Sequence, residues 1–430
     1  MFAAAATAVT ATIGPDSRWL AALGRVVAER GIPHGIPFGA ASSATWANVP
    51  VLAELTFHGL FAAFGDRGLL VAQIVAVTAG MAVLARDMRR GGATDAGSAL
   101  VLALLVPGAL LAFAGIKAQL FSLALFPLAA ALLRAEARHP SRRIWLAVPL
   151  LALWSNLHGA ALLGLAVVFS YLLLERAREA RLESLGVGVA SAIAMCATPA
   201  LAKTPHYYAA VMTSEAAKRG YGLWAPLSLR AGFDVVLIAV ALPLLVAFLW
   251  SRPRAWELAA AAGLAGLTVH AGRDGVWLLL FLAPPAAKAI RLRAKAHEAV
   301  VPAIALVLVV VGALAFLRGP SSAGASDRLV RDAIAAAHGT PILAEPATAE
   351  RIALAGGKVW ISNPLDAFSR VDQRAYIDWL QGKRSGDRLL REAEVVVVSA
   401  GSSAAQRLRS DRRFHAVGAR DGYRILVHMH

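Results

Sequence analysis

The fold of this chain is decided around one stretch, Leu153-Trp154-Ser155-Asn156-Leu157-His158-Gly159-Ala160-Ala161-Leu162-Leu163-Gly164-Leu165. An amide and an imidazole stand here beside a small-residue turn, inside an otherwise apolar run. Polar groups at membrane depth are costly and usually face a water-filled or protein-lined cavity. The stretch therefore predicts two short membrane helices joined by a turn that carries functional side chains.

The composition around this stretch is that of a polytopic membrane protein. Of the 430 residues, 58% are hydrophobic and 16% are charged, and the mean hydropathy is +0.60. A soluble chain is about 45–50% apolar and about one quarter charged. The net charge of +16 comes from arginines in short clusters between apolar runs, which is typical of cytoplasmic loops rather than of a nucleic-acid-binding surface. The single cysteine, Cys196, excludes an intrachain disulfide.

Apolar runs predict an all-α membrane domain of about eleven transmembrane helices. The first run is short for a span, and it lacks the basic region of a cleavable signal peptide. The runs are Phe2–Gly14, Gly68–Ala85, Gly97–Gly115, Gln119–Leu133, Ile144–Asn156, His158–Leu174, Leu185–Leu201, Gly232–Trp250, Trp256–Ala271, Val276–Ile290 and Val300–Leu317.

Five basic clusters set the predicted orientation in a bacterial inner membrane. Alternation along the spans brings all five to one side, which the positive-inside rule makes the cytoplasm. The N-terminus is then inside and the C-terminus outside, and the loops 15–67 and 202–230 lie on the outer side with the short turns 116–118, 156–159 and 272–275. The clusters are Arg86/Arg89/Arg90, Arg134/Arg138/Arg142/Arg143, Arg176/Arg178/Arg181, Arg252/Arg254 and Lys288/Arg291/Arg293/Lys295.

The domain organisation follows from a change of pattern after the last apolar run. Residues 1–318 form the predicted transmembrane domain, and 319–326 are a linker that contains Gly, Ser and Pro. From 327 to 430, helical and extended patterns alternate, which predicts a small extracytoplasmic α/β domain. The extended segments are Pro341–Ala344, Lys358–Ile361, Val395–Ser399 and Arg424–His428.

Asp16 is the candidate catalytic group, because it directly follows the first span at the outer interface. A carboxylate beside Arg18 could stay ionised and act as a general base. The alternative is an N-cap, since a helical pattern, Trp19–Arg30, follows. Later in the same loop, Glu54 and His58 are spaced i, i+4, which suits a helix-surface pair better than a metal site.

The candidate substrate-binding groups lie in the outer turns. Lys117 and Arg273 could hold a phosphate through charge-assisted hydrogen bonds, or could extend toward lipid headgroups; Arg273 could also pair with Asp274. Asn156 and His158 could position a substrate, or could satisfy backbone groups freed where the helix breaks. No Cys/His motif indicates a metal site.

Several short motifs resemble the GT-C superfamily of polytopic membrane glycosyltransferases, in particular the bacterial protein-mannosyltransferase-like and aminoarabinose-transferase-like group. The stretch from Trp154 to Gly159 is the most specific match. The others are Asp16-Ser17-Arg18-Trp19-Leu20, Gln119-Leu120-Phe121-Ser122, Thr198-Pro199, Trp224-Ala225-Pro226 and His270-Ala271-Gly272-Arg273.

This resemblance implies an inverting transfer of a sugar from a polyprenyl-phosphate-linked donor to a cell-envelope acceptor outside the membrane. Asp16 would be the base, and a divalent metal is used only by some members. The chain departs from the family pattern where apolar residues replace expected polar groups, at Ile36, Val49 and Pro50. These replacements motivate a second hypothesis, a non-catalytic relative that binds a lipid-linked glycan or scaffolds an envelope complex. A transporter, the third hypothesis, is disfavoured by the lack of sequence repeats and of charges within the spans.

Overall fold

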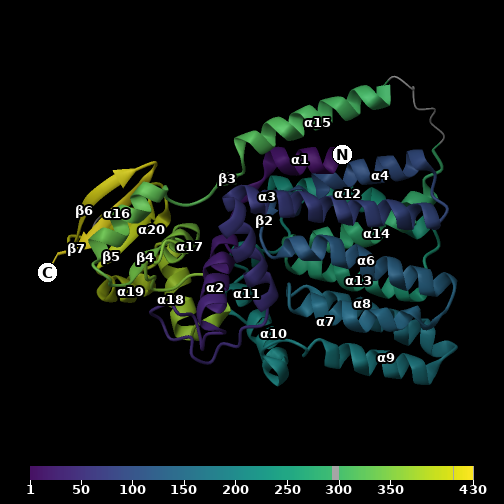
Figure 1. The fold of residues 1–430 in the computed structure, drawn as a ribbon, viewed down its shortest axis with the longest axis horizontal. Helices are drawn as coiled ribbons and strands as arrows, with labels where there is room; N and C mark the ends of the chain where they lie inside the picture. The colour runs from purple at the N-terminus through teal and green to yellow at the C-terminus, as the bar shows by residue number, and fades with distance from the viewer. Residues whose placement is uncertain (293–299, 410, 430) are drawn as a thin grey trace. The chain divides into compact units, whose positions relative to one another are not determined.

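The computed structural model describes residues 1–292, 300–409 and 411–429, and these divide into two compact units (Figure 1). The first unit comprises Met1–Thr12, Phe64–Leu201 and Leu223–Ser321; the second comprises Ile13–Ala63, Ala202–Gly222 and Ser322–His430. Each unit is therefore built from three separate stretches of chain.

The chain passes between the units within one long, interrupted helix and at four short elements. The long helix α3 (Val51–Arg90) contains a non-helical residue, Gly65, with φ 58°, close to the boundary between the units. The short strands β1 (Thr12–Ile13) and β3 (Ser321–Ser322) and the 3-10 helices η3 (Leu201–Lys203) and η4 (Gly222–Trp224) mark the other crossings.

The first unit is a bundle of helices, and each predicted apolar run contains a helix. Beyond the second half of α3, its elements are α1 (Phe2–Thr10), α4 (Asp95–Gly108), α5 (Leu110–Ala114), β2 (Gly115–Ile116), α6 (Gln119–Arg138), η1 (Arg142–Leu146), α7 (Ala147–Ser155), α8 (Ala161–Leu174), η2 (Arg176–Arg178), α9 (Arg181–Ala194), α12 (Gly232–Trp250), α13 (Ala255–His270), η5 (Gly272–Asp274), α14 (Gly275–Ala289) and α15 (Val300–Arg318).

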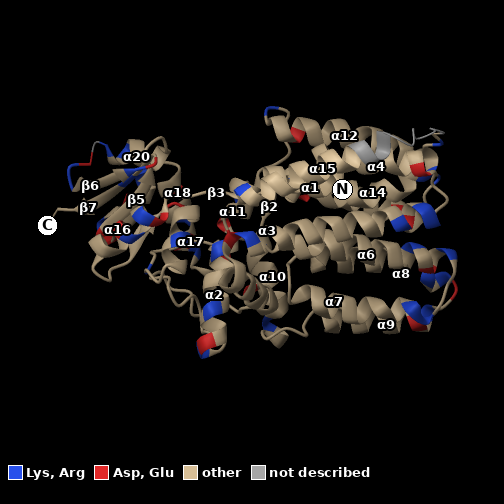
Figure 2. Ribbon diagram, turned by 45° about the horizontal axis from the view of Figure 1, so that its top comes forward, with Lys and Arg blue, Asp and Glu red and all other residues tan. Residues whose placement is uncertain are grey.

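Three of the described helices are long and apolar enough to cross a membrane: α3, α6 and α12. Two shorter apolar helices are Asp95–Gly108 and Ile304–Arg318. Charged residues gather at the ends of the bundle helices and are sparse along their length (Figure 2). This distribution is expected of helices whose middle faces hydrocarbon. The count of eleven spans stays a prediction.

The second unit contains a four-stranded mixed sheet in the order β4-β5-β7-β6. Strand β4 (Ile342–Ala344) pairs in parallel with β5 (Val395–Ser399), which pairs antiparallel with β7 (Tyr423–His428). Strand β6 (Phe414–Arg420) pairs antiparallel with β7 at the edge. The helices of the unit are α2 (Ser17–Arg30), the first half of α3, α10 (Thr204–Met212), α11 (Glu215–Lys218), α16 (Asp327–Ala337), α17 (Pro346–Leu354), η6 (Leu365–Ala367), α18 (Arg370–Leu380), η7 (Arg384–Gly386), α19 (Asp387–Glu392) and α20 (Ser403–Leu408).

The pattern of the tail predicts most of these elements well. The run Val395–Ser399 is strand β5, whose first four residues are buried. The segment Lys358–Ile361, predicted to be extended, forms only isolated bridges, from Val359 to Gly39 and Ile342. Strand β6 was missed because it is an edge strand with mostly exposed side chains, and such a strand lacks a clear apolar alternation. Of the fifth basic cluster, Arg293 and Lys295 lie outside the described residues.

Candidate functional site

In the second unit, Asp16 occupies the N-cap position of α2 with an unusual backbone. Its φ is 89°, in the left-handed region that a non-glycine residue rarely adopts. The carboxylate makes no capping hydrogen bond to the helix. Asp16 therefore occupies the N-cap position, as the alternative prediction has it, but its side chain does not cap the helix. Strained backbones of this kind gather at functional sites.

Glu350, from α17, holds the backbone of Asp16. The amide nitrogen of Asp16 donates to both carboxyl oxygens of Glu350, at 2.7 and 2.8 Å. The Nδ2 atom of Asn363 donates to the same carboxyl group at 3.0 Å. The Glu350 side chain is buried, and burial together with the negative charge of Asp16 raises the pKa of Glu350. Glu350 therefore takes up a proton much more readily than an ordinary glutamate.

Two further carboxyl groups of this unit have raised pKa values. Burial raises the pKa of Asp366, in η6, to about 6, and the charge of Asp16 adds to the effect. Burial raises the pKa of Glu54 to about 7, although a hydrogen bond from Asn48 at 2.7 Å opposes the shift. The negative charge of Asp16 thus acts on two buried carboxyl groups with raised pKa values, Glu350 and Asp366.

The prediction of a helix-surface pair at Glu54 and His58 is wrong for Glu54, whose side chain is only 1% exposed. It is buried because α2 crosses α3 there without a side chain between them: a Cβ on Gly24 would lie 2.0 Å from the carbonyl oxygen of Glu54. Among the described residues, no group of three or more His, Cys, Asp or Glu side chains could hold a metal ion.

Arg18 is the second residue of α2 and is buried within the second unit. Its Nη1 atom donates to the Ser322 hydroxyl at 2.8 Å, and its positive charge contributes to a lowered pKa at Asp327. The guanidinium is therefore oriented by groups of its own unit.

In the first unit, the Trp154–Gly159 stretch folds as the predicted turn between α7 and α8. The indole nitrogen of Trp154 donates to the Ser122 hydroxyl at 2.7 Å, and that hydroxyl lies 2.7 Å from Nδ1 of His158. The backbone nitrogen of Ala160 also points at Nδ1, at 3.4 Å. Because the N–H of Ala160 donates to Nδ1, that nitrogen carries no proton, so the Ser122 hydroxyl donates to it and the other ring nitrogen of His158 is the donor.

Gly164 explains why the stretch needs small residues after the turn. A Cβ at this position would lie 2.3 Å from the ring of Trp154, so only glycine lets α8 pack against the buried indole. The Nδ2 atom of Asn156 donates to the carbonyls of Ala152 at 2.8 Å and Ala197 at 2.6 Å. Asn156 thus hydrogen-bonds backbone carbonyl groups, as one of the two predicted alternatives has it. Its side-chain oxygen is the atom left to contact a substrate.

Two cationic side chains lie near this turn. Lys117, which precedes α6, and Arg273, in η5, both exert their charge on His158 and on Asp274. The guanidinium of Arg273 stacks over the ring of Trp224, with its carbon 3.8 Å from the ring centroid. Burial raises the pKa of Asp274, while Arg273 and Lys117 oppose the shift. The turns therefore bring two cations, Lys117 and Arg273, near the neutral imidazole of His158.

The structure thus collects the predicted residues into two groups: Asp16 and Arg18 in the second unit, and Lys117, Asn156, His158 and Arg273 in the first. Sequence reasoning missed Glu350 and Ser122. Glu350 is 334 positions from Asp16 in the sequence, and no local sequence pattern predicts a contact over that separation. Ser122 had a weak signal, since it belongs to the Gln119–Ser122 motif.

Solved structures share the fold of this chain at low sequence identity. The crystal structure of ArnT from Cupriavidus metallidurans bound to undecaprenyl phosphate matches with a TM-score of 0.54 and 15% identity, over 99% of this chain and 96% of that one. Archaeal oligosaccharyltransferase AglB from Archaeoglobus fulgidus, in complex with an inhibitory peptide and a dolichol-phosphate, matches with a TM-score of 0.55 and 11% identity, over 90% and 65%.

A third similar structure is arabinofuranosyltransferase AftD from Mycobacteria, with a TM-score of 0.51 and 16% identity, over 99% of this chain and 41% of that one. No family model matches the sequence, and no curated protein matches it. The resemblance seen in the sequence motifs is thereby confirmed at the level of the fold.

Proposed function

We propose that this chain, which has the fold of the GT-C glycosyltransferases, moves a sugar from a polyprenyl-phosphate-linked donor to a cell-envelope acceptor on the outer face of the bacterial inner membrane. In this proposal the protein has about eleven spans, an inner N-terminus, and its residues 327–430 outside. The observation that carries the proposal is the strained Asp16 backbone, fixed by the carboxyl group of Glu350.

Asp16 is the general base of the proposed reaction. Its carboxylate takes the proton of an acceptor hydroxyl as the acceptor oxygen bonds to the anomeric carbon. The bond from that carbon to the donor phosphate breaks, the configuration inverts, and the polyprenyl phosphate leaves with the bonding electrons. A general base of this type contributes about 10²- to 10⁴-fold to a rate.

The cationic groups stabilise the leaving phosphate. Lys117 and Arg273, with Arg18, supply charge-assisted hydrogen bonds to its oxygens, which gain negative charge as the bond breaks. His158 presents a ring N–H donor because the hydroxyl of Ser122 occupies its other nitrogen. Asn156 and His158 position the substrate, and no step uses a metal.

Replacement of Asp16 tests this function. Asp16→Asn and Asp16→Ala should lower transfer of a labelled sugar from a polyprenyl-phosphate donor by at least about 100-fold, with membrane insertion intact. The matched control is Asp421→Asn, an exposed aspartate whose φ of 51° is also positive. Full activity of Asp16→Asn would overturn the assignment of the base.

The second candidate, a non-catalytic lipid-glycan-binding relative, rests on the apolar replacements. Ile36 and Val49 are buried, 4% and 1% exposed, so these positions serve packing rather than polar chemistry. This candidate predicts that purified protein retains polyprenyl phosphate and that no panel of lipid-linked donors is turned over. Turnover of any donor would exclude it.

A further inference from the structure

The first unit has a second polar feature, a cavity of about 160 Å³ at the helix ends that carry the basic clusters. This is far more than the roughly 30 Å³ that one water molecule takes in the liquid. The cavity is lined by residues of α3, α6, α13, α14 and the α12–α13 turn, among them Asp87, Arg134, Arg138, Arg252, Glu257 and Lys288.

This cavity is separate from the groups of the proposed reaction. Helix α6 has Lys117 just before its first residue and Arg138 as its last, and it is 20 residues long. At 1.5 Å of rise per residue, its ends are about 30 Å apart. The cavity therefore lies at the opposite end of the same unit from the turn that carries His158.

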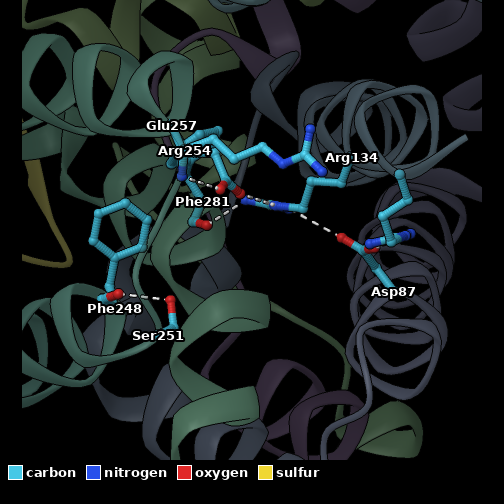
Figure 3. Close-up of polar contacts among 8 residues, drawn as sticks. Asp87, Arg134, Phe248, Ser251, Arg254, Glu257 and Phe281 are labelled. Atoms are coloured by element: carbon cyan, nitrogen blue, oxygen red, sulfur yellow. Dashed lines mark hydrogen bonds and ion pairs between the residues drawn. The ribbon is translucent and has the colours of Figure 1, made fainter. Parts of the chain in front are cut away.

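Arg134 is buried and lines the cavity, and its contacts with Asp87, Glu257 and Phe281 are drawn in Figure 3. Its guanidinium donates to Asp87 at 3.0 Å, to Glu257 at 3.3 Å and to the carbonyl oxygen of Phe281 at 2.6 Å. Both carboxylates of the lining are thus engaged by one arginine. A buried arginine with this many partners keeps a fixed geometry.

The remaining cations of the lining exceed the carboxylates that could neutralise them. Arg138 shares Asp87 with Arg134, at 3.4 Å, and Arg254 pairs with Glu175. In the described part of the chain, the side chains of Arg252 and Lys288 make no hydrogen bond or ion pair. Arg252 also has a φ of 54°, a left-handed backbone that costs a non-glycine residue stability. The cavity is therefore electropositive, with two exposed cations at its edge.

Trp250 places this edge at the level of lipid headgroups. It is the last residue of α12, it is 76% exposed, and it directly precedes the turn Ser251–Arg254 that lines the cavity. Tryptophan side chains prefer the interface between hydrocarbon and water. Basic pockets between helices at that level suit the phosphate of an anionic lipid.

We propose that this cavity binds the phosphate headgroup of an anionic phospholipid, with Arg252, Lys288 and Arg138 as its ligands. Phosphate oxygens accept charge-assisted hydrogen bonds from both guanidinium and ammonium groups. Arg134 does not bind the lipid directly; it positions the wall of the cavity through Asp87 and Glu257. A soluble phosphate could bind the same cations as the phosphate of a lipid headgroup. The test below distinguishes these two ligands.

Thermal unfolding of delipidated, detergent-solubilised protein is the test. Added phosphatidylglycerol or cardiolipin should raise the melting temperature, whereas phosphatidylcholine, whose phosphate is neutralised by choline, should not. In Arg252→Gln/Lys288→Gln the affinity for the anionic lipid should fall by about 10- to 100-fold, because two charge-assisted hydrogen bonds are replaced by weaker bonds from neutral amides. The charge-preserving Arg252→Lys/Lys288→Arg variant should keep most of the affinity.

The matched control is Arg89→Gln/Arg90→Gln, which removes two exposed charges at the same end of α3, outside the cavity. This control should bind the anionic lipid as the unmodified protein does. Equal loss in both double variants would show nonspecific attraction and overturn the site. Stabilisation by millimolar inorganic phosphate without any further effect of the lipid would overturn the lipid assignment. Because binding is measured, the result does not depend on transfer activity.

Discussion

At the scale of single residues, Asp16 and Glu350 form an unusual pair. A left-handed backbone costs a non-glycine residue about 1–3 kcal/mol, and two short hydrogen bonds to Glu350 compensate it at Asp16. The same bonds place a buried carboxyl group beside the proposed base. The proton that Glu350 holds therefore decides how much negative charge surrounds Asp16.

The raised pKa of Glu350 gives a prediction on pH and stability. Between the ordinary glutamate pKa and the raised value, the folded protein binds more protons at this site than the unfolded chain. The free energy of unfolding must then fall as the pH rises through that window, by about 1.4 kcal/mol for each unit of elevation. In Glu350→Gln this contribution to the pH dependence of the free energy of unfolding should disappear, because glutamine binds no proton in this range.

The measurement is the melting temperature from pH 5 to pH 9 in both proteins. The matched control is Glu392→Gln at an exposed glutamate of the same unit, which should keep the slope of the unmodified protein. Parallel curves for the unmodified protein and Glu350→Gln would contradict the coupling of Glu350 to folding.

At the scale of elements, close crossings of helices set where the polar groups lie. Gly24 brings α2 against the start of α3, and Gly164 brings α8 against Trp154. In each case the helical periodicity of the sequence predicts the element, and a glycine decides how near its neighbour can come. The burial of Glu54, and hence its raised pKa, depends on the first of these crossings.

Gly24→Ala should destabilise the second unit by about 1–3 kcal/mol or more, as overpacking does. The added Cβ would meet the backbone of Glu54 at 2.0 Å, and backbone cannot move aside like a flexible side chain. Gly59→Ala, in the first half of α3, is the control, because nothing lies within 4 Å of its added Cβ; it should be neutral or stabilising by up to about 1 kcal/mol. Chemical denaturation followed by hydrogen exchange of residues 13–63 measures both. Equal stability of the two variants would contradict the close crossing.

At the scale of the whole molecule, the second unit shares one core among distant stretches of chain. Trp19 and Leu23 of α2, and Ile36 from the segment after it, pack in the same cluster as the sheet residues Val395–Val398. Backbone hydrogen bonds also join Ala40 to Val359 and Ala41 to Trp360, at 2.9 and 3.0 Å. Residues 13–63 and 322–430 are therefore expected to unfold together.

Trp19→Ala should lower the stability of both segments by the same amount, about 3–5 kcal/mol. The Trp19 side chain is 2% exposed and packs edge-on against Phe38, with ring centroids 4.4 Å apart. Hydrogen exchange measured at increasing denaturant concentration gives the free energy of unfolding of each segment separately. Val371→Ala, at a 55% exposed position of the same unit, should stay within about 0.5 kcal/mol of the unmodified protein. Loss of protection in residues 13–63 alone would contradict a shared core.

The sequence by itself determined the helical segments, the class of fold and the special character of the Trp154–Gly159 turn. Apolar runs, arginine clusters and a broken helix are local patterns, and local patterns follow from the periodicity of the chain. The strands β4, β5 and β7 of the tail were also predictable from short runs of apolar residues.

Only the tertiary structure decided which groups surround Asp16 and which charged side chains line the cavity in the helical unit. Glu350 reaches Asp16 across 334 positions, and Arg134 joins Asp87 to Glu257 from three different helices. Such contacts arise from packing between elements that are remote in the chain. The pKa of a carboxyl group and the charge of a cavity depend on those neighbours, so neither could be predicted from the sequence.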